Sequence, residues 1–201
     1  MRYYVAIKAL LWRCIKFYRS IYKKVIFIAI FVCLTLSLYG QNLEDFRVSG
    51  TVLTGYWGRA TDVVIPVELG ITEIGEFAFH GRDDLRSIII PVGVTTIGNG
   101  AFEQCRRLIS IIIPESVTTI GIGAFFCCIN LTNIVIPEGV TTIGEMTFYG
   151  CESLNSIIIP ESVTTIGYSA FDECVALAPE IREDIINRFG NDPFMPYIFN
   201  W

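Results

Sequence analysis

The sequence predicts a β-rich solenoid of five 23-residue coils, closed by a strand cap at the N-terminal end and a helical cap at the C-terminal end. Three sets of residues recur at a step of 23. They are the Ile-Gly pairs from Ile74-Gly75 to Ile166-Gly167, the phenylalanines from Phe79 to Phe171, and the leucines from Leu85 to Leu177. Because one supersecondary unit at a fixed period cannot bury its apolar face alone, the copies must stack on one another.

Each coil has three predicted sides. Ser110 is followed by three β-branched isoleucines, residues 111–113, and the run ends at Pro114, which indicates a short strand closed by proline. Residues 117–120 form a second extended piece, and we expect Gly121 to make a sharp turn with positive φ. Residues 124–128 lead back as a tight turn or short helix. The side chains predicted to point inward are Leu108, Ile111, Ile113, Val117, Ile120 and Phe125.

The ends depart from the repeat. The first coil carries two extra residues within residues 67–72, predicted to form a loop, and residues 46–56 read as one or two strands around Gly50. Residues 178–189 predict a helix that begins near Pro179 and ends before Gly190. Its stripe of Ile181, Ile185 and Phe189 is expected to cover the last coil. We expect four aromatic residues of the tail, Phe194, Tyr197, Phe199 and Trp201, to fold over the same end.

Residues 1–40 have the composition of an export signal. Residues 1–24 hold seven basic and no acidic residues, and residues 25–38 are an uncharged apolar run. That run is shorter than the about 20 residues of a typical membrane span. This favours a signal peptide cleaved after Gly40, and the long basic segment leaves an uncleaved anchor as the alternative. Val32 before Cys33 argues against a lipoprotein. We expect export to the cell surface, to the periplasm or out of the cell.

The predicted organisation has four parts: a signal peptide or anchor over residues 1–40, an N-terminal cap over 41–62, repeats over 63–177, and a helical cap and tail over 178–201. The repeat unit, exemplified by residues 108–128, resembles the BspA-like (Treponema-type) leucine-rich repeats, with their pattern L-x-x-I-x-I-P-x-x-V-x-x-I-G-x-x-A-F-x-x-C. The resemblance covers residues 63–177 and departs at Arg82, which replaces cysteine, and at Thr147, which replaces alanine. It implies a leucine-rich repeat array with adhesion or protein contact as its role.

Four cysteines, Cys105, Cys128, Cys151 and Cys174, also recur at 23 residues. A zinc site needs a tetrahedral cluster, whereas this column spreads its thiols over about 14 Å at ~4.8 Å per coil. Neighbouring thiols lie within the Cα separation that a disulfide allows, although parallel side chains do not converge. We expect reduced, buried thiols, with disulfides as the alternative, and Cys127 facing outward.

The chemistry of an enzyme is not visible in the sequence. The one histidine, His80, has Glu103, Phe126, Tyr149 and Asp172 as its equivalents, which indicates a solvated turn residue. No cofactor or metal is expected, although exposed Glu115, Glu138 and Glu161 leave cation binding open. Residues 41–201 keep 8 of the 15 basic residues and all 20 acidic ones, a net charge of −12 (8 − 20). That charge argues against nucleic acid as a partner.

The outer faces of the predicted strands give the candidate binding residues. Alternation along each strand puts two columns outside. One is polar (Asp62, Ser87, Ser110, Asn133 and Ser156), and the other is aliphatic (Val64, Ile89, Ile112, Val135 and Ile158). Aligned exposed aliphatic residues usually mark an interaction site, although β-propensity alone also explains them. We expect a protein-binding module that contacts the membrane only through residues 1–40. The alternative is a membrane-anchored structural protein that self-assembles through the aliphatic column.

Overall fold

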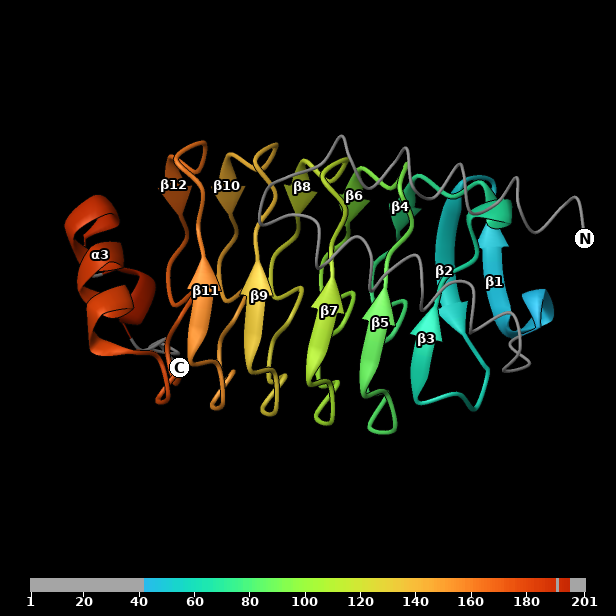
Figure 1. Ribbon diagram of the computed structural model, residues 1–201, viewed down its shortest axis with the longest axis horizontal. Helices are drawn as coiled ribbons and strands as arrows, with labels where there is room; N and C mark the ends of the chain where they lie inside the picture. The colour runs from blue at the N-terminus through green and yellow to red at the C-terminus, as the bar shows by residue number, and fades with distance from the viewer. Residues whose placement is uncertain (1–41, 191, 196–201) are drawn as a thin grey trace, which may run out of the picture. The chain divides into compact units, whose positions relative to one another are not determined.

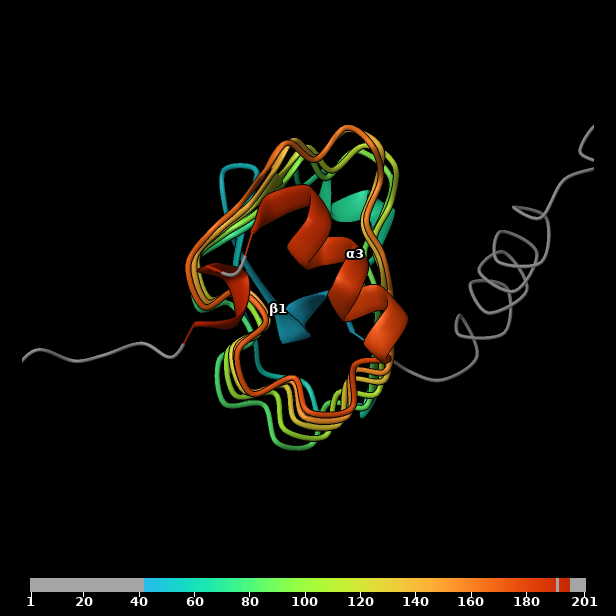
Figure 2. The same ribbon diagram turned by 90° about the vertical axis from the view of Figure 1, so that its left-hand side faces the viewer.

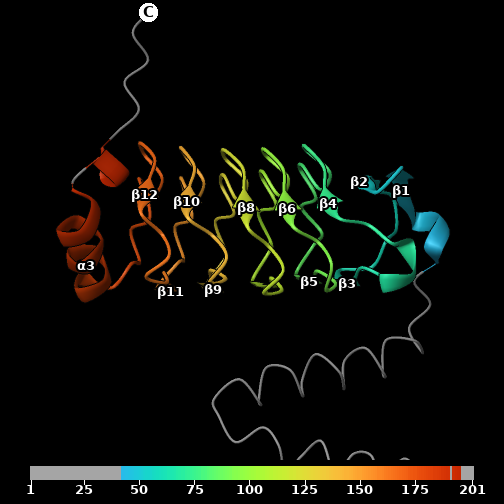
Figure 3. The same cartoon turned by 90° about the horizontal axis from the view of Figure 1, so that it is seen from above.

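Two rows of short strands, on opposite sides of a stack of coils, form the framework of this protein in the computed structural model, which describes residues 42–190 and 192–195 (Figure 1). The front row in Figure 1 contains β3 (Asp62–Val64), β5 (Ser87–Ile89), β7 (Ser110–Ile112), β9 (Asn133–Val135) and β11 (Ser156–Ile158). The back row contains β4 (Glu73–Ile74), β6 (Thr96–Ile97), β8 (Thr119–Ile120), β10 (Thr142–Ile143) and β12 (Thr165–Ile166). Figure 3 shows the two rows from above. The predicted β-solenoid is therefore confirmed.

Strands of neighbouring coils pair in parallel with the register that the 23-residue period requires. Ser110 lies beside Ser87 in the front row, and Thr119 lies beside Thr96 in the back row. The back row forms one sheet with the order β1-β2-β4-β6-β8-β10-β12. The front row consists of a three-stranded sheet, β3-β5-β7, and a two-stranded sheet, β9-β11. The outer face of the front row therefore crosses a break in strand pairing between β7 and β9.

The interior consists of columns of identical side chains. Leu108, Ile111, Val117, Ile120 and Phe125 are buried as predicted, whereas Ile113 is only partly buried against the core. The phenylalanine rings stack along the solenoid, with centroids 5.1–5.4 Å apart from Phe79 to Phe171. Stacked aromatic rings add about 0.5–1.5 kcal/mol per pair beyond the area that they bury. The turn face of the coil is therefore the most tightly specified part of the core.

The Ile-Gly glycines serve close packing, which corrects the positive φ predicted for Gly121. Gly121 is not among the residues with positive φ, which in this turn are Gly123 and Cys127. A Cβ on Gly121 would lie 2.6 Å from the backbone nitrogen of Asn99, in the preceding coil. Contacts this short do not occur for real Cβ atoms, so any larger residue would push the two coils apart. Residues 124–128 form a turn and no helix.

A β-hairpin closes the N-terminal end. The short helix η1 (Leu43–Asp45) leads into β1 (Phe46–Ser49), which pairs antiparallel with β2 (Val52–Tyr56) around Gly50, whose φ is 61°. The β2 strand then pairs in parallel with β4, so the hairpin extends the back sheet. The extra residues of the first coil form the short helix η2 (Val67–Leu69). The prediction of strands around Gly50 is confirmed, whereas the insertion forms a short 3-10 helix where a loop was expected.

Helix α3 (Pro179–Phe189) lies across the C-terminal end of the stack, as Figure 2 shows end-on. Within this helix, Ile185 is fully buried against the last coil. Ile181 and Phe189 are partly buried against the core, as the predicted stripe requires. The chain then returns through η3 (Asp192–Phe194), where the Phe194 ring lies 6.0 Å from that of Phe171. Phe194 thus covers the last coil as expected, whereas Tyr197, Phe199 and Trp201 lie outside the described residues.

The predicted export signal, residues 1–40, also lies outside the described residues. Within residues 42–190 and 192–195, no helix is long and apolar enough to cross a membrane.

Candidate functional site

The strand face, defined as the outer side of β3, β5, β7, β9 and β11, carries the two columns expected from the sequence. Strand pairing sets Val64 beside Ile89, Ile89 beside Ile112, and Val135 beside Ile158. Together these five residues form what we call the aliphatic stripe. The predicted inside-outside register therefore holds on both sides of the break between β7 and β9.

Exposure differs along the aliphatic stripe. Val135 and Ile158 are 52% and 60% exposed, while the adjacent Ile134 and Ile157 are buried at 2% and 6%. Val64, Ile89 and Ile112 are only partly exposed, so the expectation of five equally exposed side chains is not met. The side chains most open to a partner are those of the last two coils.

The polar column beside the stripe is partly engaged in its own hydrogen bonds. The Ser87 hydroxyl donates to the Asp62 carboxylate at 2.6 Å, and the Asn133 amide donates to the Thr132 hydroxyl at 3.0 Å. Ser110 lies in register beside Ser87, and Ser156 beside Asn133. The column is thus a hydrophilic border that runs along the whole stripe.

The cysteine column is free, buried and hydrogen-bonded, which confirms the prediction of unpaired thiols over disulfides. Each Sγ donates to the carbonyl of the phenylalanine 26 residues earlier, for example Cys105 to Phe79 at 3.0 Å and Cys128 to Phe102 at 3.1 Å. Burial raises the pKa of the Cys105 and Cys174 thiols to about 12. These thiols stay protonated at neutral pH, which suits a structural donor and not a nucleophile.

Cys127 lies outside that column and is partly exposed, which agrees in part with the expectation that it faces outward. Its side chain is partly buried, and its backbone has a φ of 55°. Its Sγ lies close to Gly150 in the next coil, where an added Cβ would come within 3.1 Å of the sulfur. Burial raises the pKa of its thiol as well. His80 is exposed, as predicted, and its Nε2 lies 3.8 Å from the carboxylate of Glu103. Among the residues that the structure describes, no group of three His, Cys, Asp or Glu side chains could hold a metal ion.

Arg82 takes the place of the first cysteine, and the structure explains the departure. Its guanidinium donates to the carbonyls of Tyr56 at 2.6 Å and Gly58 at 2.7 Å, and pairs with Asp84 at 2.9 Å. Tyr56 lies 23 residues before Phe79, so its carbonyl is the equivalent of the one that Cys105 binds. Arginine thus performs the donor role of cysteine and reaches one carbonyl further.

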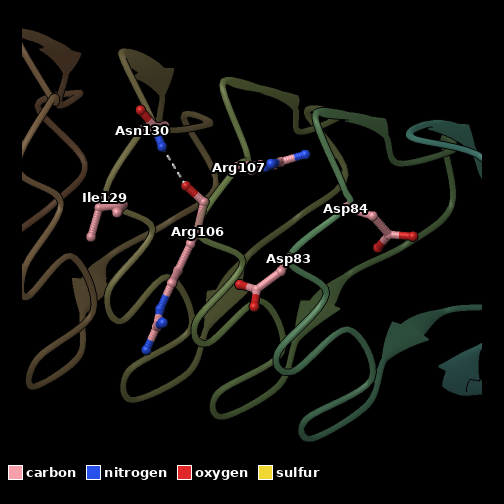
Figure 4. Close-up of a pocket in the computed structure, with 6 residues that line it drawn as sticks. All are labelled: Asp83, Asp84, Arg106, Arg107, Ile129 and Asn130. Carbon is pink, nitrogen blue, oxygen red and sulfur yellow. Dashed lines mark hydrogen bonds between the residues drawn. The ribbon is translucent and has the colours of Figure 1, made fainter.

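A shallow groove lies next to the strand face, on the turns that precede β5, β7 and β9 (Figure 4). Its volume is about 520 Å³, and its lining residues are Asp83, Asp84, Arg106, Arg107, Ile129 and Asn130. The Asn130 amide donates to the Arg106 carbonyl at 2.7 Å. In Figure 4, Arg107 extends toward the coil that carries Asp84. Residues of this groove recur in position but not in type, so the repeat pattern of the sequence does not reveal it.

The comparisons with known proteins agree with this architecture. The sequence model of the family described as "BspA type Leucine rich repeat region" matches residues 57–195 in six copies. The matched range extends beyond the predicted repeats at both ends. The phenylalanine column is likewise longer than predicted, because the rings of Tyr56 and Phe194 continue it at its two ends. No curated protein matches the chain.

Solved structures with a similar fold are bacterial leucine-rich repeat proteins. One from T. pallidum has 20% identity and a TM-score of 0.50, and the alignment covers 73% of this chain and 94% of that one. A leucine-rich cell surface protein from Faecalibacterium prausnitzii has 25% identity and a TM-score of 0.51, over 70% of this chain and 54% of that one. A protein from Bacteroides ovatus has 29% identity and a TM-score of 0.50, over 66% and 40%. The chain therefore spans about half or less of the latter two proteins.

Proposed function

The chain belongs to the BspA-type leucine-rich repeat family, and from that premise we propose that it is an exported module that binds an extended segment of another protein along its strand face. The observation that carries the proposal is the pair Val135 and Ile158, half or more exposed and in register on one face. An exposed aliphatic side chain stabilises a complex when the partner covers it, because its removal from water lowers the free energy.

The dimensions of the strand face favour an extended segment over a second copy of the chain. Five strands spaced like the stacked phenylalanine rings, 5.1–5.4 Å apart, make the stripe about 20 Å long. Strands of three residues make it about 10 Å wide at ~3.3 Å per residue. A stable complex buries about 800 Å² per partner, several times this area. Self-assembly through the stripe alone would thus bury too little, whereas about six residues of an extended chain would span it.

Export is supported by the sequence and by the family. Residues 1–24 are strongly basic and residues 25–38 are apolar. The F. prausnitzii protein with the same fold is a cell surface protein. N-terminal sequencing of the native protein separates the two forms of the proposal, because a cleaved signal leaves a terminus near Gln41 and an anchor retains Met1.

The binding proposal is tested with adjacent residues of β9. Val135→Glu places a charge on the stripe and should abolish binding to the segment, because a partner would bury that charge unpaired. It should leave the melting temperature nearly unchanged, whereas Ile134→Glu, one residue away in the core, should unfold the coil. The assay is binding of purified extracellular proteins to the full-length chain.

Thr142→Glu is the matched control, since Thr142 is exposed on the back row, away from the strand face. It should preserve both folding and binding. Binding that survives Val135→Glu in a folded protein would show that the stripe reflects β-propensity and that the partner contacts another surface. Equal loss in Val135→Glu and Thr142→Glu would point to a general charge effect.

A further inference from the structure

Of the eight arginines in the described residues, three are held at the ends of the solenoid and five are exposed, among them the adjacent pair Arg106 and Arg107. Arg82, Arg182 and Arg188 donate to backbone carbonyls at the ends of the solenoid. Arg106 and Arg107, by contrast, are exposed and make no ion pair with the residues that the structure describes. Residues 41–201 carry a net charge of −12. Against this negative background, two unpaired guanidinium groups on adjacent residues form a local region of positive charge.

The groove around them is positive despite its two aspartates. Asp84 is neutralised by Arg82, whose Nε lies 2.9 Å from Oδ1 of Asp84. That leaves Asp83 against Arg106 and Arg107, with the Asn130 amide at the far end. Exposed Arg86 lies nearby, since its carbonyl accepts a hydrogen bond from the Ile109 backbone at 2.8 Å. Figure 4 shows the Arg106 and Arg107 side chains running in different directions, so each presents its own guanidinium. A guanidinium suits a carboxylate, which arginine binds through paired hydrogen bonds.

The groove is continuous with the strand face. Arg107 precedes Ser110, the first residue of β7, by three residues, which is about 10 Å of extended chain. An arginine and a glutamate side chain together bridge that distance. No aromatic ring lines the groove, so it lacks the stacking surface with which proteins usually hold a sugar ring. These features favour a peptide carboxylate over a uronic acid.

We infer that the groove of Arg106 and Arg107 binds an acidic side chain of the protein segment that lies on the strand face. This inference rests on the proposed function and names the chemistry of its partner: an extended segment with aliphatic residues toward β9 and β11 and a glutamate or aspartate at β7. The opposite border of the face carries exposed Glu115, Glu138 and Glu161, so a segment that is acidic throughout would be repelled there. The partner is acidic on one side only.

The test uses fluorescein-labelled hexapeptides of valine and serine that carry a single glutamate, glutamine or lysine at one end. It measures anisotropy with the full-length chain at about 50 mM salt. The glutamate peptide should bind about 3- to 10-fold more tightly than the glutamine peptide, as expected for exposed ion pairs. Arg107→Gln should remove most of that preference. Arg47→Gln, which removes the same charge on β1, should leave it intact.

Several outcomes would overturn the inference. Equal affinity for the glutamate and glutamine peptides would show that the arginines take no part. Equal losses in Arg107→Gln and Arg47→Gln would reduce the effect to net charge. Binding of an oligogalacturonate through Arg107, with no binding of the glutamate peptide, would assign the groove to a polysaccharide.

The same peptides separate this inference from the proposed function. If all of them bind equally and Val135→Glu abolishes binding, the strand face stands and the arginine groove fails. If the glutamate peptide depends on Arg107 but not on Val135, the groove stands and the strand face fails. If no peptide binds to the wild-type chain, both are wrong.

Discussion

The middle and the ends of the solenoid hold backbone carbonyls with different donors, and at the N-terminal end the carbonyl is the equivalent of those in the middle. In the middle, cysteine thiols donate to the carbonyls of the stacked phenylalanines, at 3.1–3.2 Å for Cys128, Cys151 and Cys174. The backbone N–H groups of the same turns bond to the next coil, as Phe125 does to Thr147 at 2.9 Å. Donors and acceptors there both recur every 23 residues. One short side chain per coil is therefore enough to bond the phenylalanine carbonyl of the preceding coil.

At the ends the neighbouring coil is missing, and arginines take over. Arg82 reaches two carbonyls of the N-terminal cap. At the other end, Arg188 donates to the carbonyls of Ile159 and Pro160, and Arg182 to that of Cys174. The long guanidinium side chain spans the wider and irregular gap to a cap. A repeat can therefore be extended by copying a short donor, but it can be closed only by a residue with longer reach.

The largest expected effect is the difference between two deletions of similar length, one at an end of the solenoid and one in its middle. Deletion of residues 178–201 strips α3 and η3 from the last coil and exposes buried Leu177 and Phe171. Each such side chain contributes about 1.5–3 kcal/mol when buried. We expect aggregation or loss of cooperative melting. Deletion of residues 115–137 instead joins Pro114 to Glu138, which follows a proline in its own coil, and should leave a four-coil protein.

Thermal melting and size-exclusion chromatography of the two deletions check this prediction. The internal deletion should melt cooperatively at a somewhat lower temperature, because it loses one coil and no cap. If the chain without residues 178–201 stays soluble with an unchanged melting curve, α3 is not a cap. If the internal deletion also fails to fold, the coils are less interchangeable than their sequences indicate.

The middle was readable from the sequence because repetition supplies its own alignment. A 23-residue step fixes which residues stack, so the strand rows, the inward columns and the free thiols follow directly. The ends were read less completely. Tyr56 and Phe194 continue the phenylalanine column at the same step. They were not recognised as part of it because the Ile-Pro and Ile-Gly landmarks around them are absent.

Features that depend on the distance between coils could not be read from one unit. Gly121 was assigned a positive φ, whereas it is required by the 2.6 Å approach of Asn99. The partial burial of Ile113 and Ile112 is likewise a property of the stack and not of residue type. The candidate stripe followed from alternation along the strand, but the arginine groove did not, since Asp83, Arg106 and Ile129 share a position and no chemistry.

A smaller effect should reveal the thiol donors of the middle through the pH dependence of stability. Burial raises the pKa of Cys105 from 9.0 to about 12, so between these values the unfolded chain loses a proton that the folded chain keeps. Stability is therefore fully present below pH 9 and falls as the pH rises toward 12. The slope is about 1.4 kcal/mol per pH unit for each such thiol.

Urea unfolding at pH 8 and pH 10.5 measures this pH dependence. Cys105→Ser keeps a short donor but removes the titrating thiol, so its loss of stability over that interval should be smaller than that of the wild type by about 2 kcal/mol. Tyrosine ionisation affects both proteins alike and cancels in the comparison. An identical pH dependence in the two would mean that the Cys105 thiol ionises as readily in the folded chain as in the unfolded one.

The smallest effect tests the exchange of one donor for the other at a single position. Arg82→Cys gives the first coil the residue of the later coils. A cysteine there should still donate to the Tyr56 carbonyl, as Cys105 does to Phe79 at 3.0 Å. It cannot reach the Gly58 carbonyl or Asp84. We expect a loss of about 1–2 kcal/mol in the free energy of unfolding, since hydrogen bonds of charged groups contribute about 1.5–3 kcal/mol and this site is partly solvated.

Arg82→Ala removes every donor at this position and should cost about 1 kcal/mol more than Arg82→Cys, which is the contribution of one ordinary hydrogen bond. Urea unfolding gives the total loss for each variant, and hydrogen exchange of the β1–β2 hairpin shows where it falls. Because the caps are separate from the inner coils, the hairpin should lose protection while β8 and β10 keep theirs. If Arg82→Cys is as stable as the wild type, thiol and guanidinium are equivalent at the boundary, and the longer reach of arginine does not explain its presence there.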